Sequence, residues 1–227
     1  MRLLLTSSPW LQTSAAQPDS FIEIRPSKII CVGRNYRAHA NELGNRPTST
    51  PLLFFKPPSA LIEAGTPIIR PNKVGRIDFE GELAIIIGKR GRRIPAAAAT
   101  TYILGATCLN DVTARDLQKS EKQWARAKGF DTFCPLGPRV VRGSDWNDVS
   151  VVTRQNGVEV QRGRTSQMIH SIATVIEHAS AAMTLEVGDI IATGTPSGVG
   201  PISPGDIIEI DIEGIGVLQN PVVAGCD

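Results

Sequence analysis

The sequence predicts an α+β fold that is rich in β-strands in mixed sheets, with a few short helices. Its 21 glycines and 16 prolines favour a chain with many turns. Short runs of β-branched and other apolar residues recur along the chain, whereas few segments have the helical periodicity of 3.6. Strands and helices do not alternate regularly, which excludes a repeated β–α–β architecture.

The composition is that of a globular protein. Of the 227 residues, 41% are hydrophobic and 20% are charged, which is close to the average. The net charge is +2 without a concentrated basic run, and aromatic residues make up 5%, so we expect no nucleic-acid partner. No apolar run approaches the roughly 18 residues of a transmembrane helix, and we expect no membrane partner. Four scattered cysteines without a CxxC pair indicate reduced thiols and a cytoplasmic location.

The chain divides near its beginning. Residues 1–26 are weakly patterned, and we expect them to form an N-terminal strap or edge strands. From residue 27 onward the apolar runs become regular, so residues 27–227 are predicted to form a single domain. No internal repeat and no low-complexity tract interrupts that domain.

Apolar runs between turn residues predict the strands. In chain order these are residues 28–33, 52–55, 68–69, 79–88, 102–109, 133–141, 149–153 and 158–161, followed by two Gly-Asp-led runs within 188–216. Asn156-Gly157 between two of the strands is typical of a tight hairpin. Helices are predicted over 35–43, 95–100 and 166–183, and a mixture of helix and turn over 111–127.

Two carboxylates stand in the most apolar of these strands. Glu80 and Glu82 are two residues apart, so a strand directs both side chains to the same face. Buried without a partner, they would repel one another and lose hydration, and a hard divalent cation such as Mg²⁺ would relieve both costs. Asp111 follows the strand over 102–109 and would supply a third carboxylate. A solvent-exposed polar edge is the alternative interpretation of the Glu-x-Glu pattern.

His39 and Glu42 are three residues apart in the predicted helix over 35–43, so their side chains share one face. A carboxylate that orients an imidazole is a common way to build a general base. A surface pair of little energetic weight is the alternative.

Other polar groups are ambiguous when taken alone. Lys128 could be an ordinary surface lysine. Arg115 and Gln118 are three residues apart in a helical segment. Residues 193–196, Thr-Gly-Thr-Pro, form a turn whose N–H groups and hydroxyls can face an anion.

Seven sequence blocks, which occur in this order along the chain, carry a resemblance to a known protein family. They are VGRNYRAHANELG (32–44), PLLFFKPPSALI (51–62), DFEGELAIIIGK (78–89), NDVTARDLQ (110–118), QWARAKGFDTFCPLGP (123–138), GDIIATGTPSGVG (188–200) and GDIIEIDIEGIG (205–216). Together they resemble the fumarylacetoacetate hydrolase family, from about residue 27 to the end of the chain. The resemblance implies a β-rich catalytic domain, a homodimer, and a Mg²⁺- or Mn²⁺-dependent enzyme acting on a keto-acid substrate.

The resemblance also implies roles for single residues. Glu80, Glu82 and Asp111 match the metal ligands. His39 and Glu42 match a catalytic pair in a lid helix. The remaining matches are Lys128, which stabilises oxyanion or enolate charge, Arg115, Gln118 and Thr195, which hold the substrate carboxylate, and Arg34 and Tyr36, which shape the entrance.

The reaction that we expect from these residues is hydrolysis of the C–C bond of a 2,4-diketo acid, an acylpyruvate or fumarylpyruvate, to pyruvate and a carboxylic acid. The same enolate chemistry leads to an alternative, a decarboxylase or isomerase of the homoprotocatechuate type or an oxaloacetate decarboxylase. A non-catalytic protein that binds keto acids through a metal is the alternative from another class. Intact His39, Glu42 and Lys128 argue against it, because binding alone does not need them.

Overall fold

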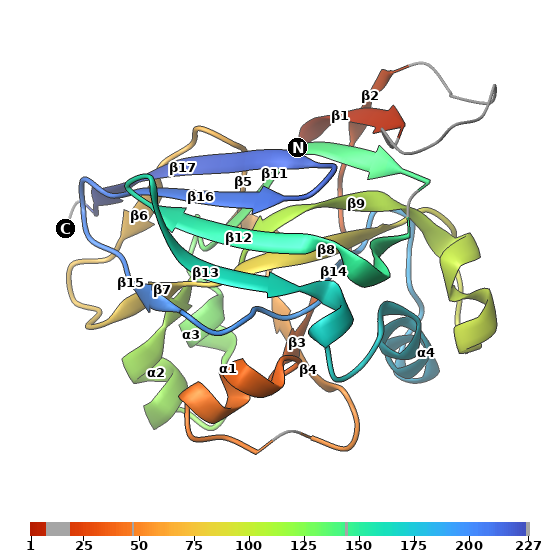
Figure 1. Cartoon of the computed structure of the whole chain (residues 1–227), viewed down its shortest axis with the longest axis horizontal. Helices are drawn as coiled ribbons and strands as arrows, with labels where there is room; N and C mark the ends of the chain where they lie inside the picture. Colours follow the sequence, from red (N-terminus) through yellow and green to blue (C-terminus); the bar gives the residue numbers. More distant parts are fainter. Residues whose placement is uncertain (8–18, 47, 144, 226–227) are drawn as a thin grey trace.

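The computed structural model describes residues 1–7, 19–46, 48–143 and 145–225. Their strands form three sheets, with a few short helices at the periphery (Figure 1). The strand-rich α+β fold expected from the sequence is confirmed.

The largest sheet runs through the middle of the molecule. Its strands in spatial order are β2 (Ser20–Glu23), β1 (Arg2–Ser7), β11 (Cys134–Arg142), β9 (Ile103–Asn110), β8 (Gly81–Ile87), β14 (Ile190–Ala192), β3 (Ile29–Gly33) and β4 (Leu52–Lys56), and β5 (Leu61–Ile62) pairs with β11. β8 runs antiparallel to β9, with Gly81 opposite Asn110. β1 joins the sheet by pairing in parallel with β11. Residues 8–18 of the N-terminal segment lie outside the described ranges.

Two smaller sheets complete the strands. One has the order β13 (Val158–Arg164), β12 (Ser150–Gln155), β16 (Ile207–Ile212), β17 (Gly216–Ala224) and β6 (Ile68–Arg70). The other has the order β10 (Thr113–Ala114), β7 (Ile77–Phe79) and β15 (Gly200–Pro201). The predicted hairpin between β12 and β13 turns at Asn156 and Gly157, both with positive φ, as a two-residue hairpin turn requires.

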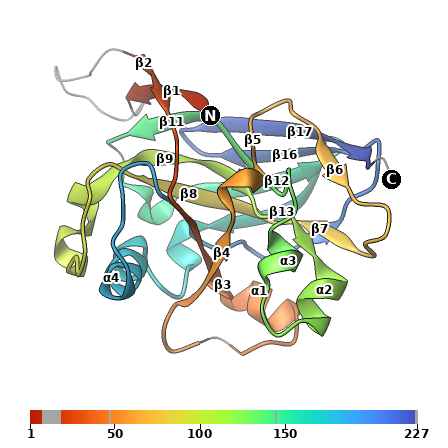
Figure 2. The same cartoon turned by 180° about the vertical axis from the view of Figure 1, so that it is seen from behind.

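The helices lie at two places. They are α1 (Arg37–Glu42), α2 (Arg115–Ser120), α3 (Ala125–Lys128) and α4 (Ile172–Ala182), and the 3₁₀ helices are Pro58–Ala60, Ala96–Tyr102, Trp146–Asp148 and Thr165–Gln167. Figures 1 and 2 show α1, α2 and α3 close together, with α4 at the other end of the molecule. None of the helices in the described ranges is long and apolar enough to cross a membrane.

β8 is buried on both faces because it lies between two hydrophobic cores. Leu83, Ile85 and Ile87 point into the larger core, which β12, β16 and α4 also line. Ala84 and Ile86 point into the smaller core beneath β1 and β11. This explains why apolar residues are continuous along most of the strand and do not alternate with polar ones.

Several element boundaries differ from the prediction; the helix expected over 166–183, for example, is α4 over Ile172–Ala182. Two of the differences lie next to the carboxylates and the His39–Glu42 pair. The strand expected over 79–88 is interrupted at Glu80, because β7 ends at Phe79 and pairs in a different sheet from β8. The helix expected from residue 35 begins at Arg37, with Tyr36 at the N-cap. The side-chain amide of Asn35 instead donates hydrogen bonds to the carbonyl oxygens of His170 and Thr193.

Three cysteines are buried and unpaired: Cys31, Cys108 and Cys134. Burial raises the pKa of all three thiols, and that of Cys134 to about 12. Cys226 lies outside the described residues.

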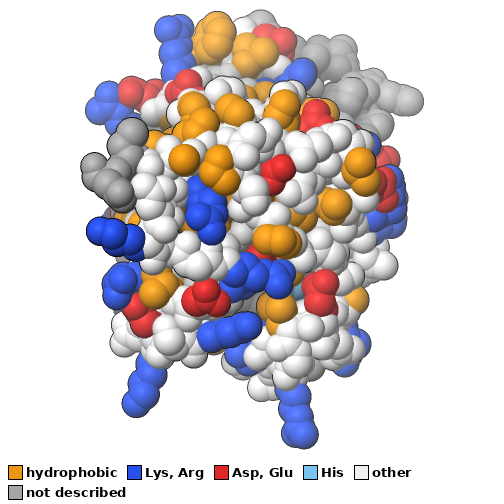
Figure 3. All heavy atoms as spheres, turned by 90° about the vertical axis from the view of Figure 1, so that its left-hand side faces the viewer, with side chains coloured by type: hydrophobic (Ala, Val, Ile, Leu, Met, Phe, Trp, Pro, Cys, Tyr) orange, Lys and Arg blue, Asp and Glu red, His pale blue; other side chains and the backbone are white. Residues whose placement is uncertain are grey.

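Basic and acidic side chains are interspersed on the face shown in Figure 3, where neither sign covers the surface alone.

Candidate metal centre and active-site cleft

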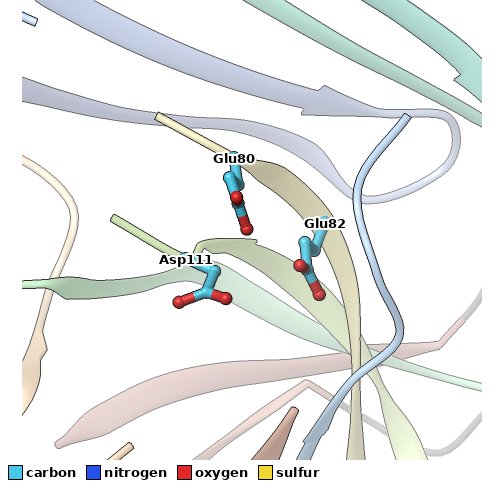
Figure 4. A group of neighbouring side chains, drawn as sticks. All are labelled: Glu80, Glu82 and Asp111. Carbon is cyan, nitrogen blue, oxygen red and sulfur yellow. The ribbon is translucent and has the colours of Figure 1, made fainter. Parts of the chain in front are cut away.

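Three buried carboxylates meet where β7 and β9 end and β8 begins. Glu80 lies between β7 and β8, Glu82 lies in β8, and Asp111 follows β9. The Asp111 amide donates to the Glu80 carbonyl oxygen at 2.9 Å, which continues the β8–β9 pairing to the carboxylates. One oxygen from each side chain lies within 4.8 Å of the others, and the three carboxylates face a common space (Figure 4).

The carboxylates do not share one electrostatic environment. Burial raises the pKa of the Glu82 carboxyl well above its usual range, and the charges of Asp111 and Glu80 add to that effect. Burial also opposes ionisation of Glu80, but the cations Lys128 and Arg115 outweigh it and hold the Glu80 pKa below its usual range. Glu82 is therefore the member of the group whose negative charge is least compensated.

Two buried lysines bind Asp111. Lys128 is at the end of α3, and its Nζ lies 2.5 Å from Asp111 Oδ2 and 2.9 Å from Glu80 Oε2. Lys56, at the end of β4, lies 2.7 Å from Asp111 Oδ1 and also donates to the Val112 carbonyl oxygen at 3.1 Å. Burial lowers the pKa of Lys128, but the neighbouring Asp111 and Glu80 raise it more, so Lys128 stays an ammonium ion.

Arg115 is held by two carboxylates. Its Nε donates to Asp78 Oδ2 at 2.8 Å, and its Nη2 lies 2.6 Å from Glu80 Oε1. Its Nη1 donates to Gln118 Oε1 at 2.9 Å, so the two residues that the sequence paired are in contact. Arg115 thereby orients Glu80, a function that the sequence did not indicate.

His39 and Glu42 are paired as the helical spacing predicts. His39 Nδ1 lies 3.3 Å from Glu42 Oε2. The Gly198 amide donates to both Glu42 oxygens, at 3.0 and 3.2 Å, which ties the end of α1 to the loop between β14 and β15. Nδ1 is thus engaged by Glu42, and His39 is one of the residues that line the cleft described next.

A cleft of about 250 Å³ joins these groups. Of the predicted site residues, those that line it are Arg34, His39, Glu80, Glu82, Arg115, Gln118, Lys128 and Thr195. Phe54 and Trp124, whose rings stack edge to face, form an apolar part of its wall.

Three predicted residues do not line the cleft. Asp111 is fully buried, and Glu42 is bonded to His39, which does line the cleft. Tyr36 is 3% exposed, and its hydroxyl has no hydrogen-bond partner within the described part of the chain. Tyr36 is therefore buried rather than placed at an entrance.

Thr195 lines the cleft, but its hydroxyl is engaged elsewhere. The hydroxyl donates to the Gly81 carbonyl oxygen at 2.9 Å and accepts from Gln161 Nε2 at 3.0 Å. The preceding residue contributes more directly, since the Gly194 amide donates to Glu82 Oε2 at 2.7 Å.

The donor set suits a divalent metal ion. Glu80, Glu82 and Asp111 offer only oxygen ligands, and Glu82 is buried beside two like charges. Hard cations such as Mg²⁺ and Mn²⁺ take carboxylate oxygens, and three such ligands leave coordination positions for water and substrate. The residues therefore fit a metal of this class.

Sequence reasoning missed Lys56, Asp78 and Gln161. Lys56 carried a signal in the sequence, because it is the one charged residue of the otherwise apolar strand LLFFK; the structure buries its side chain fully. Asp78 and Gln161 gave no comparable signal.

Comparisons with known proteins agree with this site. Residues 28–223 match the family described as fumarylacetoacetate (FAA) hydrolase C-terminal. The chain is 45% identical over 212 residues to oxaloacetate tautomerase YisK of Bacillus subtilis, covering 87% of this chain and 70% of that protein. It is 44% identical over 195 residues to the mitochondrial oxaloacetate decarboxylase of Dictyostelium discoideum, covering 83% and 89%.

A solved structure gives the same result. The crystal structure of 5-carboxymethyl-2-hydroxymuconate delta-isomerase from Mycobacterium smegmatis is 50% identical and superimposes with a TM-score of 0.85, covering 90% of this chain and 81% of that one. The three relatives are named as a tautomerase, a decarboxylase and an isomerase, so the chain is similar to enzymes. The family match over nearly the whole chain confirms the resemblance found in the sequence, and this protein belongs to the fumarylacetoacetate hydrolase family.

Proposed function

We propose that this protein is a divalent-metal-dependent enzyme that interconverts the keto and enol forms of a short 2-oxo dicarboxylic acid such as oxaloacetate, and that can release CO₂ from it. The observation that carries the proposal is the His39–Glu42 pair, because His39 lines the same small cleft as Glu80 and Glu82 and is bonded to Glu42. Two relatives named for oxaloacetate chemistry, at 44% and 45% identity, support the substrate class.

The metal ion and Lys128 would both stabilise negative charge on the substrate. A Mg²⁺ or Mn²⁺ ion held by Glu80, Glu82 and Asp111 would supply Lewis-acid stabilisation of negative charge on the substrate oxygen. Lys128 adds a fixed positive charge at the same place, because Glu80 and Asp111 hold its ammonium group in the cleft wall.

His39 moves the proton. In the keto form it takes a proton from C3 of the substrate, and the C–H electron pair becomes the C2–C3 double bond as negative charge passes to the C2 oxygen. Return of the proton to that oxygen gives the enol. Glu42 stabilises the imidazolium formed between the two steps.

The remaining groups of the cleft fit a small dianion. Arg34 lines the cleft, and its Nε is buried without a partner among the residues described, so it can bind a substrate carboxylate. The volume of about 250 Å³ lies below the usual range for ligand pockets, which favours a substrate of few carbon atoms.

Hydrolysis of an acylpyruvate is the second candidate, and the same His39–Glu42 pair favours it. An imidazole held in this way can take a proton from water as well as from carbon, and the hydroxide would attack the distal carbonyl. Cleavage of the C3–C4 bond would then release pyruvate and a carboxylic acid.

A substrate panel separates the two candidates. Oxaloacetate, acetylpyruvate, fumarylpyruvate and a hydroxymuconate-type acid are assayed with added Mg²⁺. The proposal predicts that keto–enol exchange and CO₂ release from oxaloacetate are fastest. Pyruvate release from acetylpyruvate, with oxaloacetate unchanged above the metal-only background, would establish hydrolysis instead.

Lys128→Met should lower turnover by about 10²–10³, with a smaller change in KM, because the negative charge that Lys128 faces grows as the enolate forms. Steady-state kinetics on oxaloacetate measures both constants. Lys73→Met, at an exposed lysine, is the control. A raised KM at unchanged turnover would make Lys128 a binding residue only.

A homodimer, a cytoplasmic location and a single catalytic domain over 27–227 remain predictions. Light scattering on the eluting protein tests the first, with a mass of twice 24.3 kDa expected.

A further inference from the structure

Gln161 lies outside the cleft but bonds to two of its walls. It comes from β13 and is 1% exposed. Its Oε1 accepts hydrogen bonds from the Gly81 amide at 3.1 Å and the Thr153 hydroxyl at 2.8 Å. Its Nε2 donates to Thr195 Oγ1 at 3.0 Å and to the Pro196 carbonyl oxygen at 2.8 Å. These four bonds use both donors and both acceptor positions of the amide.

The first of these partners is the residue between two carboxylates of the metal centre. Gly81 separates Glu80 from Glu82, and its backbone lies so close to β12 that a Cβ there would come within 2.2 Å of Thr153 Oγ1. Gln161 accepts from the Gly81 amide and Thr195 donates to the Gly81 carbonyl oxygen, so the peptide units on both sides of Gly81 are bonded. The spacing of the two glutamates therefore depends on bonds that come from outside their own strand.

Thr195, the second partner, closes a ring of hydrogen bonds with Gln161 and Gly81. Thr195 Oγ1 accepts from Gln161 and donates to Gly81, while Gln161 accepts from Gly81. The adjoining Gly194 amide donates to Glu82. The turn over residues 193–196 and the segment over residues 80–82 are thus held as one unit, and Gln161 is the side chain that contacts both.

We propose that Gln161 is a positioning residue: it holds Glu80 and Glu82 at the separation that lets them bind one divalent cation and fixes the Thr195 turn against them. This inference rests on the metal site proposed above. Outer groups that orient metal ligands typically contribute about 10- to 100-fold to metal affinity. Gln161 acts in this way through a backbone amide and a hydroxyl rather than through a direct bond to a carboxylate.

The test is the affinity of the full-length protein for Mn²⁺, measured by calorimetry and by the loss of the free-ion electron paramagnetic resonance signal. Gln161→Met keeps the length of the side chain and removes all four bonds. It should weaken Mn²⁺ binding by about 10- to 100-fold. Gln155→Met is the matched control, because Gln155 lies in the neighbouring strand and its amide donates to Pro201 and Asp206, away from the metal centre.

Thr195→Val tests the ring. If Gln161 acts through Thr195 and Gly81, the two substitutions together should weaken Mn²⁺ binding by less than the product of their separate effects. Mn²⁺ affinities of Gln161→Met and Gln155→Met that both equal the wild-type value would overturn the proposal, as would fully multiplicative effects of Gln161→Met and Thr195→Val.

A milder variant covers the case in which Gln161→Met does not fold. Thr153→Val removes one of the four bonds and should weaken Mn²⁺ binding in the same direction by a smaller factor. An unchanged affinity in Thr153→Val would then count against the proposal. Absence of Mn²⁺ binding in the wild-type protein would instead overturn the metal site itself, so the two failures are distinguishable.

Discussion

Glu82→Gln should abolish activity at ordinary metal concentrations, because it removes the least compensated negative charge from the carboxylate group. Lys128, Arg115 and Lys56 already neutralise most of the charge on Glu80 and Asp111. Without the Glu82 carboxylate, the remaining ligands would offer a divalent cation little net attraction. Calorimetric titration with Mn²⁺ and turnover with oxaloacetate measure the two losses.

Metal removal gives the complementary result for the wild-type protein. A chelator should remove activity, and added Mg²⁺ or Mn²⁺ should restore it, whereas Glu82→Gln should not recover under the same conditions. Glu209→Gln, in β16, is the control for a charge lost away from the site. Full activity after exhaustive chelation, with no metal found by elemental analysis, would exclude the proposed chemistry.

His39→Ala should lower proton transfer by about 10²–10⁴, the usual contribution of a general acid–base group. Mn²⁺ affinity should stay close to the wild-type value, because His39 is not among the carboxylate ligands. CO₂ release from oxaloacetate should fall much less, since it needs enolate stabilisation but no base. Glu42→Gln should give a milder loss, because the imidazole remains but its orienting charge is gone.

The control for this variant is His178→Ala, at a half-buried histidine of α4 away from the cleft. Keto–enol exchange at nearly the wild-type rate in His39→Ala would assign the proton transfer to another group. Loss of Mn²⁺ binding in His39→Ala would make His39 a ligand and would contradict the proposed division of roles.

The groups that sequence reasoning could find are those whose geometry is local. Glu80 and Glu82 are two residues apart, and His39 and Glu42 are three apart, so strand and helix periods alone bring each pair together. The interruption at Glu80 did not matter, because the Asp111 amide donates to the Glu80 carbonyl oxygen and continues the pairing of β8 with β9.

Sequence reasoning could not find the groups whose contacts depend on which strands are neighbours in the sheets. Gln161 reaches Gly81 only because β13 and β12 lie across β8, and Asp78 reaches Arg115 because β7 pairs with β10. Neither pairing follows from apolar patterning, which predicts that strands exist but not which strands are neighbours. The resemblance implied that Tyr36 shapes an entrance, whereas Tyr36 is 3% exposed and its backbone forms a β-bridge with Met168.

The rates at which the buried thiols react with an alkylating reagent would report how the fold opens. Cys31 and Cys134 belong to the smaller core, Cys108 belongs to the larger one, and their raised pKa values leave almost no thiolate at neutral pH. Because the thiolate is the species that alkylating reagents attack, these side chains should stay unlabelled until their core opens. In a Cys226→Ser background, the labelling rates of the three thiols would therefore report whether the two cores open together or one after the other.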